Sequence, residues 1–133
     1  MVSTLIADRL RWRRDASERD RDALRAAFTA YLTALARARD AFSRTEPSPE
    51  RVGKGHIAIV EHDVYAAQQQ LALVAQQPIL DMASRATLSV LDFHDVVVVG
   101  RDSDTAEYVH AWRAVREARQ VLVDEMRTAL RRT

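Results

Sequence analysis

Cysteine is absent from this chain of 133 residues, and glycine and proline occur only three times each. Without cysteine the chain has no disulfide, no thiolate nucleophile and no cysteine-ligated metal, which is typical of a reducing compartment. Few glycines and prolines leave few positions that interrupt regular structure. No hydrophobic run approaches the roughly 18 to 20 residues that a membrane-spanning helix needs. These absences favour long, uninterrupted helices.

Lysine is nearly absent as well, because Lys54 stands alone beside 19 arginines. Together with 22 alanines, this excess of arginine indicates the coding bias of a GC-rich genome. The formal net charge is only +1, so any attraction to nucleic acid or to a membrane must be local. Hydrophobic residues make up 47% of the chain and charged residues 29%, a balance typical of one folded, water-soluble domain.

Two proline-containing stretches divide the chain. "TEPSPE" at 45–50 predicts a helix start, with Ser48 as the N-cap and Pro49 at the first helical position. "QQPI" at 76–79 contains Pro78, at which a helix must break or kink. Almost no loop separates the segments on either side of Pro78, so they form either two helices or one strongly kinked helix.

A third stretch, "GRDSD" at 100–104, predicts another helix boundary. Gly100 suits a C-terminal cap, and Asp104 with Glu107 has the spacing of a capping box at the start of the last helix. The preceding "DVVVVG" at 95–100 would suit a buried strand, but no partner strand is found elsewhere. We therefore predict that it ends the third helix.

Hydrophobic residues recur at spacings of three and four in each segment, as on one face of a helix. The four stripes are Leu24, Phe28, Tyr31, Leu35, Ala38 and Phe42; Ile57, Val60, Val64, Ala67, Leu71 and Val74; Ile79, Ala83, Ala86, Val90, Phe93 and Val97; and Tyr108, Trp112, Val115, Leu122, Met126 and Leu130. We predict an all-α fold, an antiparallel helical bundle of four helices, or of three long ones if Pro78 only kinks the chain. Gly53 and Gly55 would delay the start of the second helix.

Residues 1–22 precede the first stripe and carry many charges of both signs. Oppositely charged residues at the i,i+4 spacing, which support a helix in water, are Arg11 with Asp15, Arg14 with Glu18 and Asp15 with Arg19. We therefore divide the chain into a charged, projecting helix start at 1–22 and a helical bundle at 23–133.

Four histidines suggest a search for a metal site. Glu107 and His110 have the Glu-x-x-His spacing of di-iron carboxylate bundles, but the second pair and the two further glutamates are missing. His62 lies opposite the second stripe, and His56 and His94 fall on the flanks of their helices, so the four do not converge. The sequence predicts four solvated surface histidines and no metal ligand.

Acid–base clusters at "EHD" (61–63) and "DFHD" (92–95) do not predict catalysis, because helical neighbours point about 100° apart and do not share a site. No serine lies on a glycine-flanked elbow, and "GKG" at 53–55 is too short to cradle a phosphate. The tyrosines and Trp112 are expected to fill the core rather than to line a ligand pocket. The sequence thus favours a non-enzymatic role, with no catalytic or cofactor-binding residue.

One local basic cluster surrounds a tryptophan near the N-terminus. Its members are Arg9, Leu10, Arg11, Trp12, Arg13 and Arg14. A nucleic-acid role is not expected, because the acidic residues that follow at 15–22 would repel phosphates. Arginines with an interfacial tryptophan, placed after small and apolar residues, are instead typical of the cytoplasmic edge of a membrane helix. We predict that these six residues contact an anionic membrane surface.

The stretch "STLIADRLRWRRDASERDRDALRAAFTAYLTALARARDAF" resembles the region that follows the single N-terminal membrane anchor in a group of uncharacterised helical proteins of actinobacterial type. The similarity extends over an arginine-rich helix, a tyrosine–leucine motif like "AYLTAL" at 30–35, and alanine-rich helices divided by a proline like Pro78. The anchor itself is not in this chain, which is either the soluble part of such a protein or a member of a soluble branch. The resemblance implies no activity and no site residue.

These observations lead to one leading hypothesis and two alternatives. The leading hypothesis is a non-enzymatic interaction or scaffold domain in the cytoplasm, at the inner face of the cell membrane, with an unidentified protein partner. The first alternative is a soluble protein that self-associates through helix one or another apolar stripe, as in a coiled coil. The second is a bundle that binds a small molecule or a metal.

Overall fold

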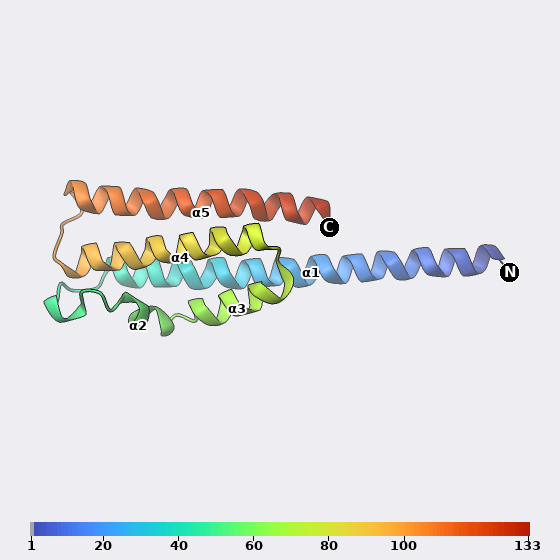
Figure 1. Ribbon diagram of the computed structural model, residues 1–133, viewed down its shortest axis with the longest axis horizontal. Helices are drawn as coiled ribbons and strands as arrows, with labels where there is room; N and C mark the ends of the chain where they lie inside the picture. The colour runs from blue at the N-terminus through green and yellow to red at the C-terminus, as the bar shows by residue number, and fades with distance from the viewer. Residues whose placement is uncertain (1) are drawn as a thin grey trace.

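The computed structural model describes residues 2–133 (Figure 1). Met1, which belongs to the predicted projecting helix start, lies outside the described residues. The elements are α1 (Val2–Ser43), the 3₁₀ turn η1 (Pro49–Arg51), α2 (Gly55–Val60), α3 (Val64–Val74), α4 (Gln77–Val98) and α5 (Ala106–Arg132). None of residues 2–133 forms a strand, and the valine run at 96–99 ends α4, as predicted, with Val98 as the last helical residue and Val99 in the turn that follows.

The helices pack as an antiparallel bundle (Figure 1). The pair α2 and α3 returns beside α1, α4 reverses direction again, and α5 returns along α4. The most extensive packing joins α4 with α5 and α1 with α3. The first part of α1 extends past the end of the other helices, so the predicted all-α bundle with a projecting first helix is confirmed (Figure 1).

The hydrophobic stripes predicted for the first and third helices are buried at every position. Tyr31, Ala83 and Phe93 have no measurable exposure, and Leu35 is only 3% exposed. Each fully buried large apolar side chain stabilises the fold by roughly 1.5–3 kcal/mol. The stripe of the last helix is buried at its centre, where Val115, Leu122 and Met126 join the core, and partly exposed at its ends.

The second predicted helix is the main difference from expectation. Instead of one long helix, the structure has η1, α2 and α3, with a left-handed residue, Asp63 (φ 63°), between α2 and α3. This break changes the helical register, so the predicted stripe residues Ile57 and Val60 of α2 are exposed instead of buried, and Val74, at the end of α3, is exposed as well. Ile59, which lay outside the predicted stripe, is fully buried in their place.

The junction between α3 and α4 is a true break. Ala75 and Gln76 have extended backbone conformations, and Pro78 lies in the first turn of α4, where its missing N–H costs nothing. Helices two and three of the prediction are therefore separate, and the alternative with three long helices is wrong.

The predicted caps are confirmed in part. Gly100 has a φ of 94°, and its N–H donates to the Val97 carbonyl, as expected of a C-terminal glycine cap. The N-cap of α5 is Thr105, whose hydroxyl accepts from the Tyr108 N–H at 3.3 Å, and not Asp104 as predicted. Ser48 precedes η1 as expected, but its side chain makes no capping hydrogen bond.

A buried polar network connects α1, α3 and α4. The Tyr31 hydroxyl donates to the Ala83 carbonyl at 2.6 Å and lies 2.6 Å from the Thr87 hydroxyl. Thr87 lies 3.1 Å from Gln68 Oε1, and Gln68 Nε2 donates to Ser84 Oγ. Burial raises the pKa of Tyr31 to about 12, although the hydrogen bond with Thr87 acts in the opposite direction. The network thus fixes the relative positions of three helices.

Replacing Tyr31 with phenylalanine is expected to lower the free energy of unfolding by about 1–2 kcal/mol, since buried hydrogen bonds are lost.

The raised pKa of Tyr31 also predicts that stability depends on pH. Between pH 10 and about 12 the folded protein retains a phenolic proton that the unfolded chain has lost, so stability falls as pH rises through this window. Urea denaturation below pH 10 and between pH 10 and about 12 should show that the wild type loses free energy of unfolding as the pH rises, and that Tyr31→Phe loses less. Equal losses in both proteins would contradict the assignment.

Candidate functional site

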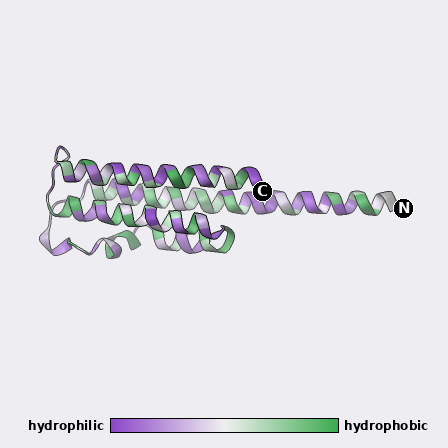
Figure 2. Cartoon of the chain, turned by 45° about the horizontal axis from the view of Figure 1, so that its top comes forward, coloured by the Kyte–Doolittle hydropathy of each residue, from purple (hydrophilic) through white to green (hydrophobic). Residues whose placement is uncertain are grey.

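The part of α1 that extends beyond the bundle is the candidate interaction site. Residues 4–22, called the projecting segment below, have exposed side chains except for Ala16, which is partly buried. Its large hydrophobic side chains are well exposed, at 64% for Leu5, 54% for Ile6, 58% for Leu10 and 67% for Trp12. Figure 2 shows hydrophobic and hydrophilic residues interspersed along the part of α1 that extends beyond the bundle. Grouped exposure of large apolar side chains is typical of a surface that contacts a partner or a membrane.

The six residues predicted to contact a membrane all lie on the projecting segment, and all are exposed. Successive residues of a helix are rotated by about 100°, so six consecutive residues surround the helix axis. We call residues 9–14 the Arg–Trp belt. Uncharged residues precede the belt at 4–7, and acidic residues alternate with arginines after it at 15–22. The belt is therefore a ring around the helix and not a patch on one side.

The arginines of the belt are not neutralised by carboxylates. Within the described residues, the only side-chain ion pairs join Arg39 with Asp40 and His94 with Asp95. The predicted i,i+4 pairs of the projecting segment are thus not formed, and the Arg19 guanidinium donates to the Asp15 backbone carbonyl instead. Exposed pairs of this type gain little against the entropy of ordering two long side chains.

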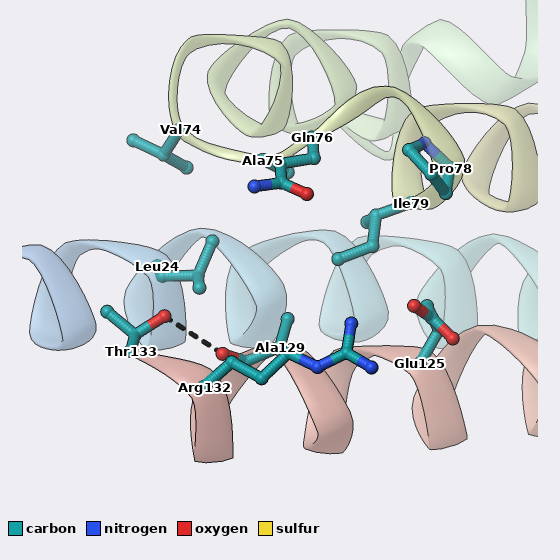
Figure 3. Close-up of a pocket in the computed structure, with 10 residues that line it drawn as sticks. All are labelled: Leu24, Val74, Ala75, Gln76, Pro78, Ile79, Glu125, Ala129, Arg132 and Thr133. Carbon is teal, nitrogen blue, oxygen red and sulfur yellow. Dashed lines mark hydrogen bonds between the residues drawn. The ribbon is translucent and has the colours of Figure 1, made fainter.

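A small pocket of about 180 Å³ lies where α1 leaves the bundle (Figure 3). Leu24 of α1 and Ile79 of α4 line it together with the last turn of α5. Beside it, Ser17 Oγ and Arg21 Nη2 donate to the Thr133 backbone oxygen, at 3.4 and 3.2 Å. The end of α5 therefore braces the base of the projecting segment against the bundle.

The histidines are placed differently from the prediction. His56 and His110 are exposed, as expected, and His62 is partly buried, but His94 is only 2% exposed. His94 is buried because α4 contacts α2 as well as α1 and α5, and it therefore buries His94 and Val98 in addition to the predicted stripe. Across residues 2–133, no three His, Asp or Glu side chains are grouped so that they could hold a metal ion.

The stretch "DFHD" brings two neighbours together, contrary to the expectation that they would not share a site. His94 Nδ1 lies 3.1 Å from Asp95 Oδ1, and the same carboxylate oxygen accepts from the Gly53 N–H at 3.1 Å. The only sequence features that could have indicated this group of contacts were "DFHD" and "GKG", which lie far apart along the chain. Sequence reasoning missed this group because only the fold brings the two stretches into contact.

No protein-family model, curated protein or solved structure matches this chain. Within the described residues, no helix is both long and apolar enough to cross a membrane.

Proposed function

We propose that this protein is a non-enzymatic interaction or scaffold domain that the projecting segment holds at the cytoplasmic face of a membrane. The observation that supports this role is the exposed Arg–Trp belt at the far end of a helix that extends beyond the bundle. Its four arginines have no ion-pair partner among the described residues, so they are free to bind anionic lipid headgroups.

The shape of the belt favours an end-on approach of the helix. A helix that lies flat on a membrane needs one broad apolar face, whereas the four arginines of the belt span about 200° of this helix and leave Trp12 in the remaining sector. Uncharged residues 4–7, with Leu5 and Ile6 exposed, would enter the headgroup region first. Trp12 and the arginines would then lie at the interface, which such side chains prefer.

The bundle would stand away from the lipid surface in this arrangement. The first core residue, Leu24, lies twelve positions after Trp12, which is about 18 Å at 1.5 Å per residue, and the end of α5 reaches to Ser17, about 7.5 Å from Trp12. The acidic residues Asp15, Glu18, Asp20 and Asp22 occupy this spacer and are repelled by an anionic surface. The outer surface of the bundle thus stays accessible to a protein partner.

Vesicle sedimentation tests this proposal. We expect the wild-type protein to bind vesicles of phosphatidylcholine that contain phosphatidylserine, to bind pure phosphatidylcholine vesicles more weakly, and to dissociate as the salt concentration rises. Absence of binding, or equal binding to both kinds of vesicle, would contradict the membrane role.

Self-association is the second candidate, because the projecting segment is electrostatically complementary to an antiparallel copy of itself. In the register that places Arg14 opposite Asp15, the other opposed pairs on the same side of the helix are Arg11 with Glu18 and Asp8 with Arg21. Light scattering of the lipid-free protein distinguishes the two candidates. A dimer that persists on dilution and does not bind vesicles would favour self-association, and a monomer at all concentrations would exclude it.

A further inference from the structure

A second hollow lies at the end of the bundle opposite the projecting segment. It has a volume of about 470 Å³ and is bounded by the end of α1, by α2 with its flanking turns, and by His94 of α4. We call it the His94 cleft. Figure 1 shows α2 at the end of the bundle away from the N-terminus, so this cleft is far from the Arg–Trp belt.

His94 lines the cleft, and one of its ring nitrogens makes no hydrogen bond. The Asp95 carboxylate can only accept hydrogen bonds, so the proton of the neutral imidazole lies on Nδ1, which is 3.1 Å away. Nε2 makes no hydrogen bond within the described residues, yet no buried side-chain nitrogen or oxygen there is left unpaired. Nε2 therefore keeps some accessible surface, and His94 is one of the residues that line the cleft.

The segment that covers His94 is held by specific contacts. The Gly53 N–H donates to Asp95, and the Ser48 N–H donates to the Val98 carbonyl at 2.8 Å. Gly55 approaches His94 so closely that a Cβ atom there would lie 3.0 Å from Nδ1. Asp63 has the left-handed conformation that L-residues rarely adopt. The contacts of Gly53 and Gly55 lie in the interrupted part of the chain before α3, so the broken helix shapes this side of the cleft.

The walls of the cleft combine positive charge with an apolar surface. Arg51 and Lys54, the only lysine of the chain, contribute cationic side chains. Phe42 forms an apolar wall, with its ring centroid 4.7 Å from that of His94 and 5.9 Å from that of His62. Ile57 and Ala58 continue the apolar surface, and Glu61 is the one carboxylate that lines it.

We propose that the His94 cleft binds a small organic acid that carries a hydroxyl group. Arg51 and Lys54 pair with its carboxylate or phosphate, as cations do with oxyanions. Phe42 and Ile57 cover its apolar body, and His94 Nε2 accepts a hydrogen bond from its hydroxyl. The Asp95 carboxylate keeps the imidazole in the tautomer that this contact needs.

Histidine NMR signals test the proposal, because the chain has only four histidines. We expect 4-hydroxybenzoate to shift the imidazole signals of His62 and His94 in a saturable way and to leave those of His56 and His110 unchanged. Benzoate, which lacks the hydroxyl, should bind about tenfold more weakly. A 4-hydroxyphenyl phosphate titration shows whether phosphate is preferred to carboxylate. If neither acid gives a saturable shift, or if all four histidines respond alike, the site does not exist.

Exposed cationic residues provide variants that leave the core intact. Lys54→Ala and Arg51→Ala should each raise the Kd of the acid about tenfold or more, since each removes a charged hydrogen-bond donor. Arg116→Ala on α5 removes the same charge from an exposed position outside the cleft and should leave the Kd unchanged. If Lys54→Ala has the circular dichroism of the wild type and an unchanged Kd, the proposal is wrong. If benzoate and 4-hydroxybenzoate bind with equal Kd, His94 does not accept a hydrogen bond from the ligand's hydroxyl.

Discussion

Replacing the four arginines of the Arg–Trp belt with glutamine is expected to weaken binding to anionic vesicles about 1,000-fold. Each basic side chain near an anionic surface contributes about 1 kcal/mol, so four of them contribute about 4 kcal/mol. The belt is exposed and has no contact with the core, so the substitutions should leave the fold unchanged. Vesicle sedimentation at constant ionic strength measures the effect.

A matched control separates the belt from the net charge of the protein. The control variant carries glutamine at four exposed arginines of α5, namely Arg113, Arg116, Arg127 and Arg131. It has the same net charge as the belt variant, but its changes lie on the bundle. Equal loss of vesicle binding in both variants would show that attraction to the membrane is distributed over the protein, and the belt would lose its proposed role.

Truncating Phe93 to alanine is expected to lower the free energy of unfolding by about 3–5 kcal/mol. Phe93 is fully buried at the contact between α4 and α5, and its ring makes edge contacts with Tyr108 and Trp112, at centroid distances of 5.2 and 5.4 Å. The Arg39 guanidinium covers the same Trp112 ring from α1, at 5.6 Å. The truncation therefore leaves a cavity and removes the aromatic contacts that join α4 to α5.

Leu88→Ala is the control for this measurement, because Leu88 lies on the same helix but is 58% exposed. This substitution should change the free energy of unfolding by no more than about 0.5 kcal/mol, as is usual for surface positions. Urea denaturation followed by far-ultraviolet circular dichroism gives both values. Similar effects of the two substitutions would mean that Phe93 does not have the buried position described above.

Hydrophobic periodicity was sufficient to predict the long helices. In α1 and α4 every predicted stripe residue is buried, because a helix of many turns faces its neighbours with a constant register. The exposed belt was also identified from the sequence, since residues 9–14 lie outside any stripe and depend on no tertiary contact. Its role at a membrane stays a prediction.

The prediction was wrong where tertiary contacts outweigh helix propensity. Asp63 adopts a left-handed conformation although its neighbours favour helix, and the change of register exposes Val60 and buries Ile59. His94 was predicted to be solvated because it lies beside the stripe and not in it. Its burial depends on the approach of Gly55, which the spacing of residues in α4 does not reveal.

The sequence by itself determined the all-helical architecture, the projecting start of the first helix and the location of the Arg–Trp belt. These features depend on composition and on local periodicity, which act within one helix at a time. Only the tertiary structure decided where the second predicted helix breaks. It also decided that His94 and Asp95 contact the turn at Gly53–Gly55. These contacts join segments about forty residues apart, and local energies of a few tenths of a kcal/mol per residue are too small to determine such contacts alone.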